Sequence, residues 1–182
     1  MELQPVAQRF VLHWGEMGTR WGVNRTVSQI HALLYITGRP MDADEITQTL
    51  GVARSNVSTS LKELLSWRLV RVVHQFGERK DLFETSTDIW ELFRIIVEGR
   101  KQREIEPTLG VLRECLSSAD MAKEDVGAQA RIRETLEFME TLTRWSDEML
   151  RLPPETLVKV LKLGARISKL VRPGDDGPEA GS

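Results

Sequence analysis

Several residue types are scarce in this chain of 182 residues, and their scarcity excludes whole classes of protein. The single cysteine, Cys115, excludes an internal disulfide and is typical of a cytoplasmic protein. The three histidines, His13, His31 and His74, lack the spacing of metal ligands. No apolar run is long enough to span a membrane, and no secretory signal is recognisable near the N-terminus.

The motifs that catalysis needs are also missing. The sequence contains no glycine-rich phosphate loop, and neither Ser55 nor Ser58 has a histidine nearby in the sequence. An enzyme would need such a loop, a nucleophile with its base, or a cluster of metal ligands. We therefore predict a protein that is not an enzyme and that binds neither a cofactor nor a metal.

A basic excess is missing from the chain as a whole, whose net charge is −2 and whose isoelectric point is about 6.0. Nucleic-acid-binding domains are usually basic. Residues 54–81, however, hold six Lys and Arg against three Asp and Glu, a net of +3. Residues 82–182 have a net charge of −4, and residues 41–50 contain three acids and no base. We expect the acidic parts to face away from any nucleic acid.

Strong helix signals are present in residues 41–66. Asp42 and Glu45 have the spacing of a helix-capping box, and Gly51 is suited to end the helix with a positive φ. A second helix is predicted from about Arg54. Its apolar residues recur at helical spacing: Val57, Leu61, Leu64 and Leu65. The short gap between the two helices predicts a helix-turn-helix.

The other face of the second helix is polar. It carries Arg54, Ser55, Asn56, Ser58, Thr59 and Lys62. A recognition helix places such residues, above all those of its first turns, against base edges in the major groove of duplex DNA. Arginine reads guanine and asparagine reads adenine, whereas serine and threonine serve bases or phosphates. In an isolated helix this face would indicate only solvation, but the hairpin that follows favours DNA.

That hairpin is predicted from strands near residues 71–76 and 82–87, joined by a turn over residues 77–81. The turn carries two adjacent cations, Arg79 and Lys80. After a helix-turn-helix, a basic hairpin predicts a wing that follows the phosphate backbone or enters the minor groove. An ordinary charged turn would be the interpretation of the hairpin alone.

From Arg20 to about Arg103 the chain resembles the GbsR-type branch of the MarR superfamily of winged-helix regulators. The resemblance rests on the stretches NRTVSQIHALLY, PMDADEITQTLGVARSNVSTSLKELLSWRLV and GERKDLFE. It implies a dimeric transcriptional regulator, expected to be a repressor, that binds operator DNA and in some members responds to a small molecule. Two residues depart from the usual pattern: Thr47 replaces a small residue, and Ala53 stands where serine often caps the recognition helix.

We expect a mainly α protein in four parts. An N-terminal helix within residues 1–23, broken at residues 18–22, precedes a winged domain over residues 24–87. The first helix of that domain is predicted to start with a cap at Thr26 and to bury Val27, Ile30, Leu33 and Leu34. Helices over residues 88–171, broken or kinked at Pro107, and a disordered tail over residues 172–182 complete the chain.

The C-terminal helices carry an apolar stripe. Its members are Ile132, Leu136, Met139, Leu142, Trp145 and Met149. A two-fold protein matches the symmetry of DNA half-sites, so the stripe predicts a homodimer. A helical cap on a monomer is the alternative.

Two further interpretations stay open. Trp14, Trp21 and Trp90 are weak candidates for an effector site, since aromatic faces can bind a quaternary ammonium, although core and interface anchoring is the favoured role. Cys115 is expected to be a small buried residue rather than a redox sensor. A winged helix that binds another protein, without DNA readout, is the alternative function.

Overall fold

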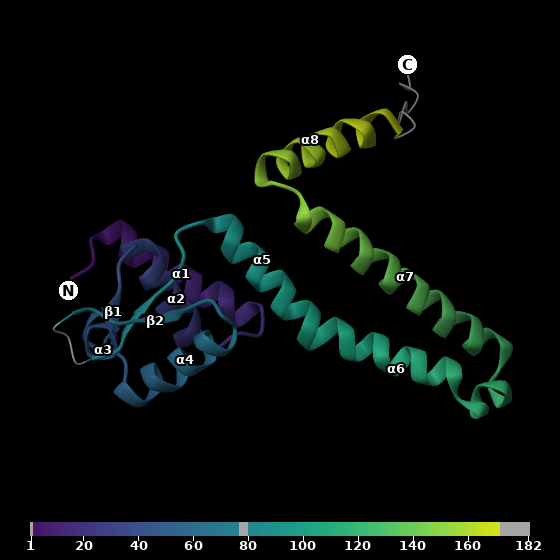
Figure 1. Cartoon of the computed structure of the whole chain (residues 1–182), viewed down its shortest axis with the longest axis horizontal. Coiled ribbons are helices and arrows are strands. Elements are labelled where there is room, and N and C mark those ends of the chain that lie inside the picture. Colours follow the sequence, from purple (N-terminus) through teal and green to yellow (C-terminus); the bar gives the residue numbers. More distant parts are fainter. Residues whose placement is uncertain (1, 77–79, 172–182) are drawn as a thin grey trace, which may run out of the picture. The chain divides into compact units, whose positions relative to one another are not determined.

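The computed structural model describes residues 2–76 and 80–171, with side chains up to Gly164, and the chain divides into two compact units after Glu104. Helices dominate both units, and a small sheet belongs to the first (Figure 1). This confirms the predicted fold class of a mainly α protein with a winged helix-turn-helix. The tail over residues 172–182, predicted to be disordered, and the wing residue Arg79 lie outside the described residues.

The first two helices, α1 (Pro5–Arg20) and α2 (Arg25–Thr37), approach each other unusually closely. A Cβ atom placed on Gly18 would lie 1.9 Å from Ser28 Oγ, and one on Gly15 would lie 2.6 Å from Gln29 Cγ. The break predicted over residues 18–22 therefore starts later, at Trp21. The helix continues to Arg20, and the glycine serves to bring the two helices together rather than to end one of them.

The central helix of the first unit is α2, which is buried along residues 27–34. This confirms the predicted burial of Val27, Ile30, Leu33 and Leu34. The predicted cap at Thr26 is wrong, because Asn24 caps the helix and its side-chain Oδ1 accepts a bond of 2.8 Å from the backbone N–H of Thr26. An asparagine in extended conformation just before a helix is itself a strong cap.

The helix-turn-helix consists of α3 (Ala43–Leu50) and α4 (Arg54–Ser66). Asp42 caps α3 as predicted, with Oδ1 accepting bonds of 2.7 Å and 2.8 Å from the backbone N–H groups of Asp44 and Glu45. The carboxylate of Glu45 pairs with Arg39. Gly51 follows α3 with a φ of 64°, which confirms the predicted left-handed end.

The wing is an antiparallel sheet of three strands in the order β1-β3-β2. Strands β2 (Arg71–Val73) and β3 (Leu82–Glu84) form the predicted hairpin but are shorter than predicted. The additional strand, β1 (Met41–Asp42), pairs with β3, so that Met41 lies opposite Phe83. Two residues are too few to show alternation, which is why the sequence gives no sign of β1. Its pairing ties the wing to the start of α3.

Helix α5 (Ile89–Arg100) is capped by Asp88 as predicted, and a π-helical turn (Lys101–Ile105) follows it. The next helix, α6 (Glu106–Ser117), has Pro107 in its first turn. Proline is tolerated there because the missing N–H would have had no partner within the helix. The helical signal on both sides of Pro107 is thus divided between two helices, and the proline starts the second one.

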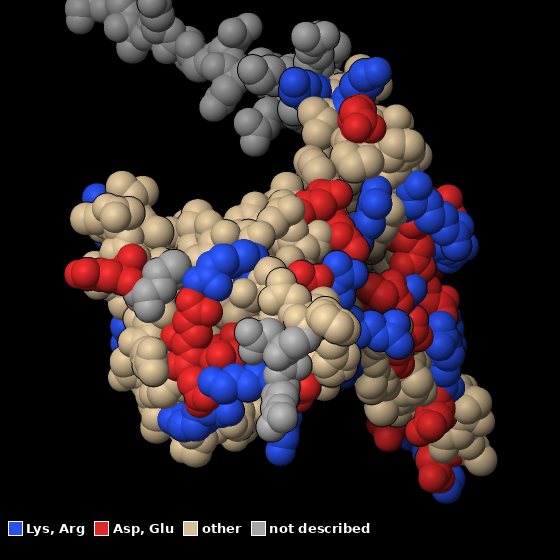
Figure 2. Space-filling model, turned by 60° about the vertical axis from the view of Figure 1, so that its left-hand side comes forward, with Lys and Arg blue, Asp and Glu red and all other residues tan. Residues whose placement is uncertain are grey.

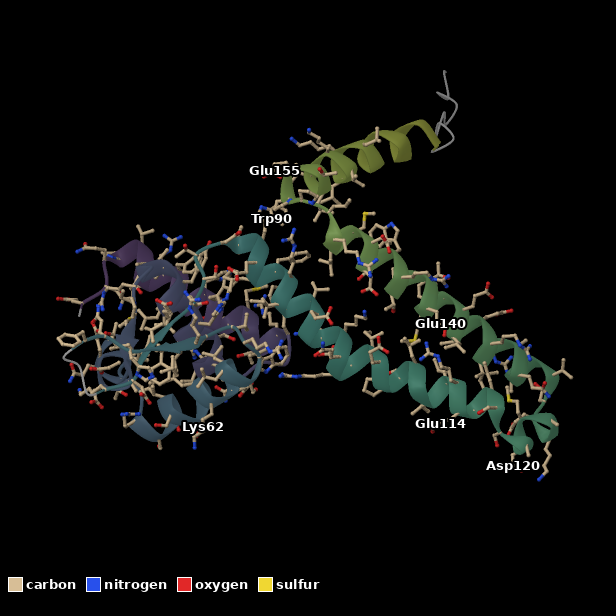
Figure 3. All side chains as sticks on the ribbon, in the orientation of Figure 1. Lys62, Trp90, Glu114, Asp120, Glu140 and Glu155 are labelled. Carbon is tan, nitrogen blue, oxygen red and sulfur yellow. The ribbon has the colours of Figure 1, made fainter. Side chains whose placement is uncertain are left out.

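The second unit continues with a 3₁₀ turn (Ala119–Lys123), α7 (Val126–Arg151) and α8 (Pro154–Val171). Helices α6 and α7 pack together (Figure 3), and Arg113 of α6 and Glu140 of α7 form an ion pair with 2.8 Å between Nη2 and Oε1. Within the described single chain, no residue of α7 is buried. Cys115 is exposed, so the expectation of a buried cysteine is wrong.

Candidate nucleic-acid interface

Helix α4 presents the predicted polar residues on its outer side. Arg54, Ser55, Asn56, Thr59 and Lys62 are exposed and Ser58 is half-buried. The opposite side of α4 is buried: Val57, Ser60, Leu61 and Leu64. The apolar spacing therefore fixes the rotation of α4, and that rotation brings six of the eight predicted site residues to one surface.

The first turn of α4 starts without a side-chain cap, because Ala53 offers no acceptor. The backbone N–H groups there are free to meet a phosphate, which helix N-termini bind well. Lys62 projects outward further along α4 (Figure 3) and makes no ion pair with any described residue. It is accordingly a cation available to a polyanion.

The two other described cations of the predicted site are joined by one carboxylate. Asp44, in the first turn of α3, has Oδ1 2.9 Å from Arg54 Nε and Oδ2 2.8 Å from Lys80 Nζ. Asp42 Oδ2 lies 3.2 Å from the same Lys80 Nζ. Arg54 Nη1 also donates a hydrogen bond of 2.7 Å to Ser58 Oγ. Helix α4, the wing and the start of α3 therefore share one polar network.

This network shifts the pKa values of the charged groups that form it. Hydrogen bonds from Lys80, and then from Arg54, hold the pKa of Asp44 below its ordinary value. Hydrogen bonding to Asp44, and then to Asp42, raises the pKa of Lys80. The pKa of Asp42 is lowered mainly by the backbone N–H of Glu45. All three groups are therefore charged at neutral pH.

The expectation that acidic residues turn away from the cations is wrong for Asp42 and Asp44. Positive and negative side chains are interspersed on the face shown in Figure 2. The clustering of three acids in residues 41–50 was visible in the sequence, but its contact with Arg54 and Lys80 was not, because it depends on β1 joining the wing to α3.

A groove of about 430 Å³ lies between α4 and the wing. Its walls include Arg54, Ser58, Lys62, Val72 and Lys80. Asp42, Asp44 and Asp81 also line it, so that three cations and three carboxylates share one concave surface. Such a surface can follow a polyanionic backbone while the exposed turns of α4 reach into a groove of a duplex.

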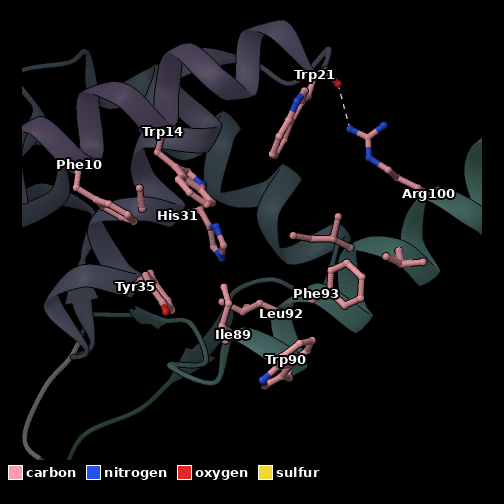
Figure 4. A pocket seen from close by; sticks show the side chains of 13 residues that line it. Phe10, Trp14, Trp21, His31, Tyr35, Ile89, Trp90, Leu92, Phe93 and Arg100 are labelled. Carbon is pink, nitrogen blue, oxygen red and sulfur yellow. Dashed lines mark hydrogen bonds between the residues drawn. The ribbon is translucent and has the colours of Figure 1, made fainter. Parts of the chain in front are cut away.

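A second, mostly apolar pocket of about 600 Å³ lies on the first unit (Figure 4). The structure brings the three predicted effector residues, Trp14, Trp21 and Trp90, together in its lining, from α1, the end of α1 and α5. Arg100 also lines it and donates a hydrogen bond of 3.0 Å to the carbonyl of Trp21. Sequence spacing did not suggest that these tryptophans share a cavity.

His31 of α2 forms part of the wall of this pocket, with only 7% of its surface exposed. Burial lowers the pKa of His31 to about 4, so the ring is neutral at pH 7. The hydroxyl of Thr85 donates to the Leu69 carbonyl at 2.6 Å, and it therefore accepts from His31 Nε2 at 3.2 Å. This leaves Nδ1 of the neutral ring as a hydrogen-bond acceptor.

The described part of the chain offers little to other kinds of site. Its residues include no group of three or more His, Cys, Asp or Glu that could hold a metal ion. None of the described helices combines the length and the apolar character that crossing a membrane requires.

Comparison with known proteins agrees with this geometry. A family model described as "MarR family" matches residues 21–79. "Putative HTH-type transcriptional regulator YvaV" of Bacillus subtilis (strain 168) is 24% identical over 91 residues, which are 50% of this chain and 51% of that protein. "HTH-type transcriptional repressor OpcR" of the same organism is 25% identical over 73 residues, 40% of each chain. The matches thus span about half or less of these relatives.

A solved structure described as that of a transcriptional regulator has the same fold. It matches with a TM-score of 0.66 at 15% identity, over 80% of this chain and 96% of that one. Neither of the two curated relatives is named as an enzyme, in agreement with the sequence-based prediction. The helix-turn-helix and its wing thus lie in the part of the chain, residues 21–79, that is similar to the MarR family of proteins.

Proposed function

We propose that this protein is a sequence-specific transcriptional regulator that binds operator DNA as a homodimer. The observation that carries the proposal is the outer side of α4, where Arg54, Ser55, Asn56, Thr59 and Lys62 are exposed together above a buried apolar side. Base edges are read by donors and acceptors of this kind in the first turns of a recognition helix. Lys80 and, from the sequence, Arg79 add cations for the phosphates.

The exposed apolar surface of the second unit supports the homodimer. Phe138, Leu142 and Trp145 lie at i, i+4 and i+7 on α7, and their side chains are 66%, 51% and 55% exposed. Exposed apolar surface that is this contiguous marks an interaction site. A second copy of the chain is the partner we propose, because a two-fold protein can engage two half-sites of one duplex.

Within the family we propose the GbsR-type branch and the role of a repressor. The stretches NRTVSQIHALLY and GERKDLFE support the branch. The curated relative OpcR is named as a repressor, which supports the sign of regulation. A DNA-binding regulator with one cysteine is expected to act in the cytoplasm.

We also propose that a small-molecule effector controls DNA binding. The pocket bounded by Trp14, Trp21 and Trp90 is mostly apolar, and His31 contributes one acceptor. A small, largely apolar effector would bury its surface there, whereas a quaternary ammonium would use the aromatic faces. Titration with tetramethylammonium and with a neutral aromatic alcohol, followed by tryptophan fluorescence, separates the two. No response to either would contradict an effector at this pocket.

The test of DNA binding measures fluorescence anisotropy of duplex fragments from the genomic neighbourhood of the gene at several salt concentrations. Log affinity should fall linearly with log salt, because phosphate contacts release counterions. Lys62→Gln should weaken binding to all sequences and reduce the slope by about 0.9. Arg54→Ala should cost about 1–3 kcal/mol and relax the preference at one base position. Lys123→Gln, which removes a cation from the second unit, is the matched control.

The alternative function, a winged helix that binds only protein, gives a different outcome in the same assay. It predicts no binding to any fragment, or binding that ignores salt. Either result would contradict the proposed function.

A further inference from the structure

Asp44 occupies an unexpected place for a carboxylate in a DNA-binding surface. It contacts Arg54 of the recognition helix through Oδ1 at 2.9 Å and Lys80 of the wing through Oδ2 at 2.8 Å. The three side chains are about half exposed, at 49%, 51% and 56%. They are therefore accessible to a phosphate or a base that approaches the groove between α4 and the wing.

The contacts of Asp44 are not needed to hold α3 or the wing in place. Exposed ion pairs usually contribute less than about 1 kcal/mol to stability. Helix α3 is capped by Asp42 instead, and the wing is attached to it by the backbone pairing of β1 with β3. The effect of Asp44 is accordingly to be sought in what Arg54 and Lys80 can bind.

Two effects follow from the geometry. Asp44 engages Nε of Arg54 while Ser58 engages Nη1, and these two contacts restrain the plane of the guanidinium. A restrained plane favours the bidentate contact that reads a base. At the same time the negative charge of Asp44 offsets the positive charges of Arg54 and Lys80. This weakens their attraction to the phosphates of DNA of any sequence.

We propose, on the basis of the proposed DNA binding, that Asp44 is a positioning residue that determines sequence specificity. It orients Arg54 for base reading and limits the binding of Arg54 and Lys80 to phosphates. Reading of a base by Arg54 leaves its contact with Asp44 in place, whereas a phosphate that binds Arg54 or Lys80 competes with the Asp44 carboxylate.

The experiment compares four full-length variants with the wild type. Asp44→Asn removes the negative charge that contacts both Arg54 and Lys80, and Asp44→Glu keeps a negative charge at this position. Asp42→Asn is the matched control, because it removes a charge beside Lys80, leaves Arg54 paired, and retains a good capping residue. Glu16→Gln removes an exposed carboxylate from α1. Each protein is titrated against a duplex enriched by the wild type from a random library and against a random-sequence duplex.

Asp44→Asn should bind the random duplex more tightly, with a log–log salt slope steeper by roughly 0.9 to 1.8. The ratio of affinities for the two duplexes should fall at least about tenfold, which is the discrimination of one base contact. Asp42→Asn should steepen the slope without losing preference at the base that Arg54 reads. Asp44→Glu should restore most of the ratio, and Glu16→Gln should equal the wild type.

Three outcomes would overturn this role. The ratio could stay unchanged in Asp44→Asn, or affinity for both duplexes could fall alike, or Asp42→Asn could reproduce the whole effect. Thermal unfolding of each variant shows whether a loss of affinity comes from a destabilised fold. If Asp44→Asn is destabilised, the comparison of Asp44→Glu with the wild type tests the proposal instead. Failure of the wild type to enrich any duplex would instead contradict the proposed function itself.

Discussion

At the scale of single residues, the sequence predicts which side chains gather but not how they pair. The apolar spacing of α4 correctly exposes Arg54 and Lys62, because burial of Val57 and Leu64 fixes the rotation of the helix. Pairing of Arg54 and Lys80 with Asp44 depends instead on contacts across 10 and 36 positions. Patterns within a single helix or hairpin do not predict contacts between residues so far apart in the sequence.

His31 gives a residue-scale prediction about pH. Burial lowers its pKa from 6.5 to about 4. Between these two pH values the ring is mostly neutral in the folded protein and mostly protonated in the unfolded chain. The stability from this residue is complete above pH 6.5 and is lost as the pH falls toward 4. The loss should be on the order of 3 kcal/mol in the free energy of unfolding.

Urea unfolding of the wild type and His31→Gln at several pH values between 7 and 4 measures this loss. Gln retains a donor for the Thr85 hydroxyl but does not titrate. The difference in unfolding free energy between the two proteins should shrink as the pH falls. A difference independent of pH would contradict the neutral, buried histidine.

At the scale of elements, most helices follow from caps and periodicity, as with Asp42, Asp88 and Gly51. The failures have physical reasons. Gly18 carries no sign of whether it ends a helix or permits a neighbouring one to approach, since both uses require the missing Cβ. Pro107 shows the same ambiguity, because proline fits the first turn of a helix as well as a kink.

The close approach of α1 and α2 leads to an element-scale prediction. Gly18→Ala places a Cβ 1.9 Å from Ser28 Oγ, and overpacking of this kind typically costs 1–3 kcal/mol. Gly110→Ala is the control, because a Cβ there meets no described atom within 4 Å and alanine favours the helix. Chemical denaturation should show Gly18→Ala less stable and Gly110→Ala equal to or more stable than the wild type. Equal stability of the two variants would argue against the tight helix pair.

At the scale of the whole molecule, the sequence indicates an apolar stripe on α7 without showing which side of the helix is covered. Of the predicted stripe, Ile132, Leu136 and Met139 are half-buried in the single chain, while Leu142 and Trp145 are exposed. Phe138, which the predicted stripe did not include, is exposed beside them. The half-buried side of the stripe is consistent with the packing of α6 on α7. The exposed side is the surface proposed for the homodimer.

Leu142→Glu tests that surface directly. A fully buried leucine contributes roughly 1.5–3 kcal/mol, so a charge in its place should raise the dimer dissociation constant at least about tenfold. Arg133→Gln, with the same change in charge on another exposed side of α7, should not. Sedimentation velocity of the full-length proteins at micromolar concentration measures both. A wild type that is monomeric in this experiment would contradict the homodimer.

The central claim is sequence-specific binding of duplex DNA through α4 and the wing, and in vitro selection tests it most directly. The full-length protein is incubated with a random-sequence duplex library, and bound molecules are sequenced over successive rounds. We predict enrichment of a two-fold symmetric sequence with half-sites about one helical turn, or a multiple of it, apart. The same selection with Arg54→Ala should lose preference at one position in each half-site. Failure of the wild-type protein to enrich any sequence would contradict the account.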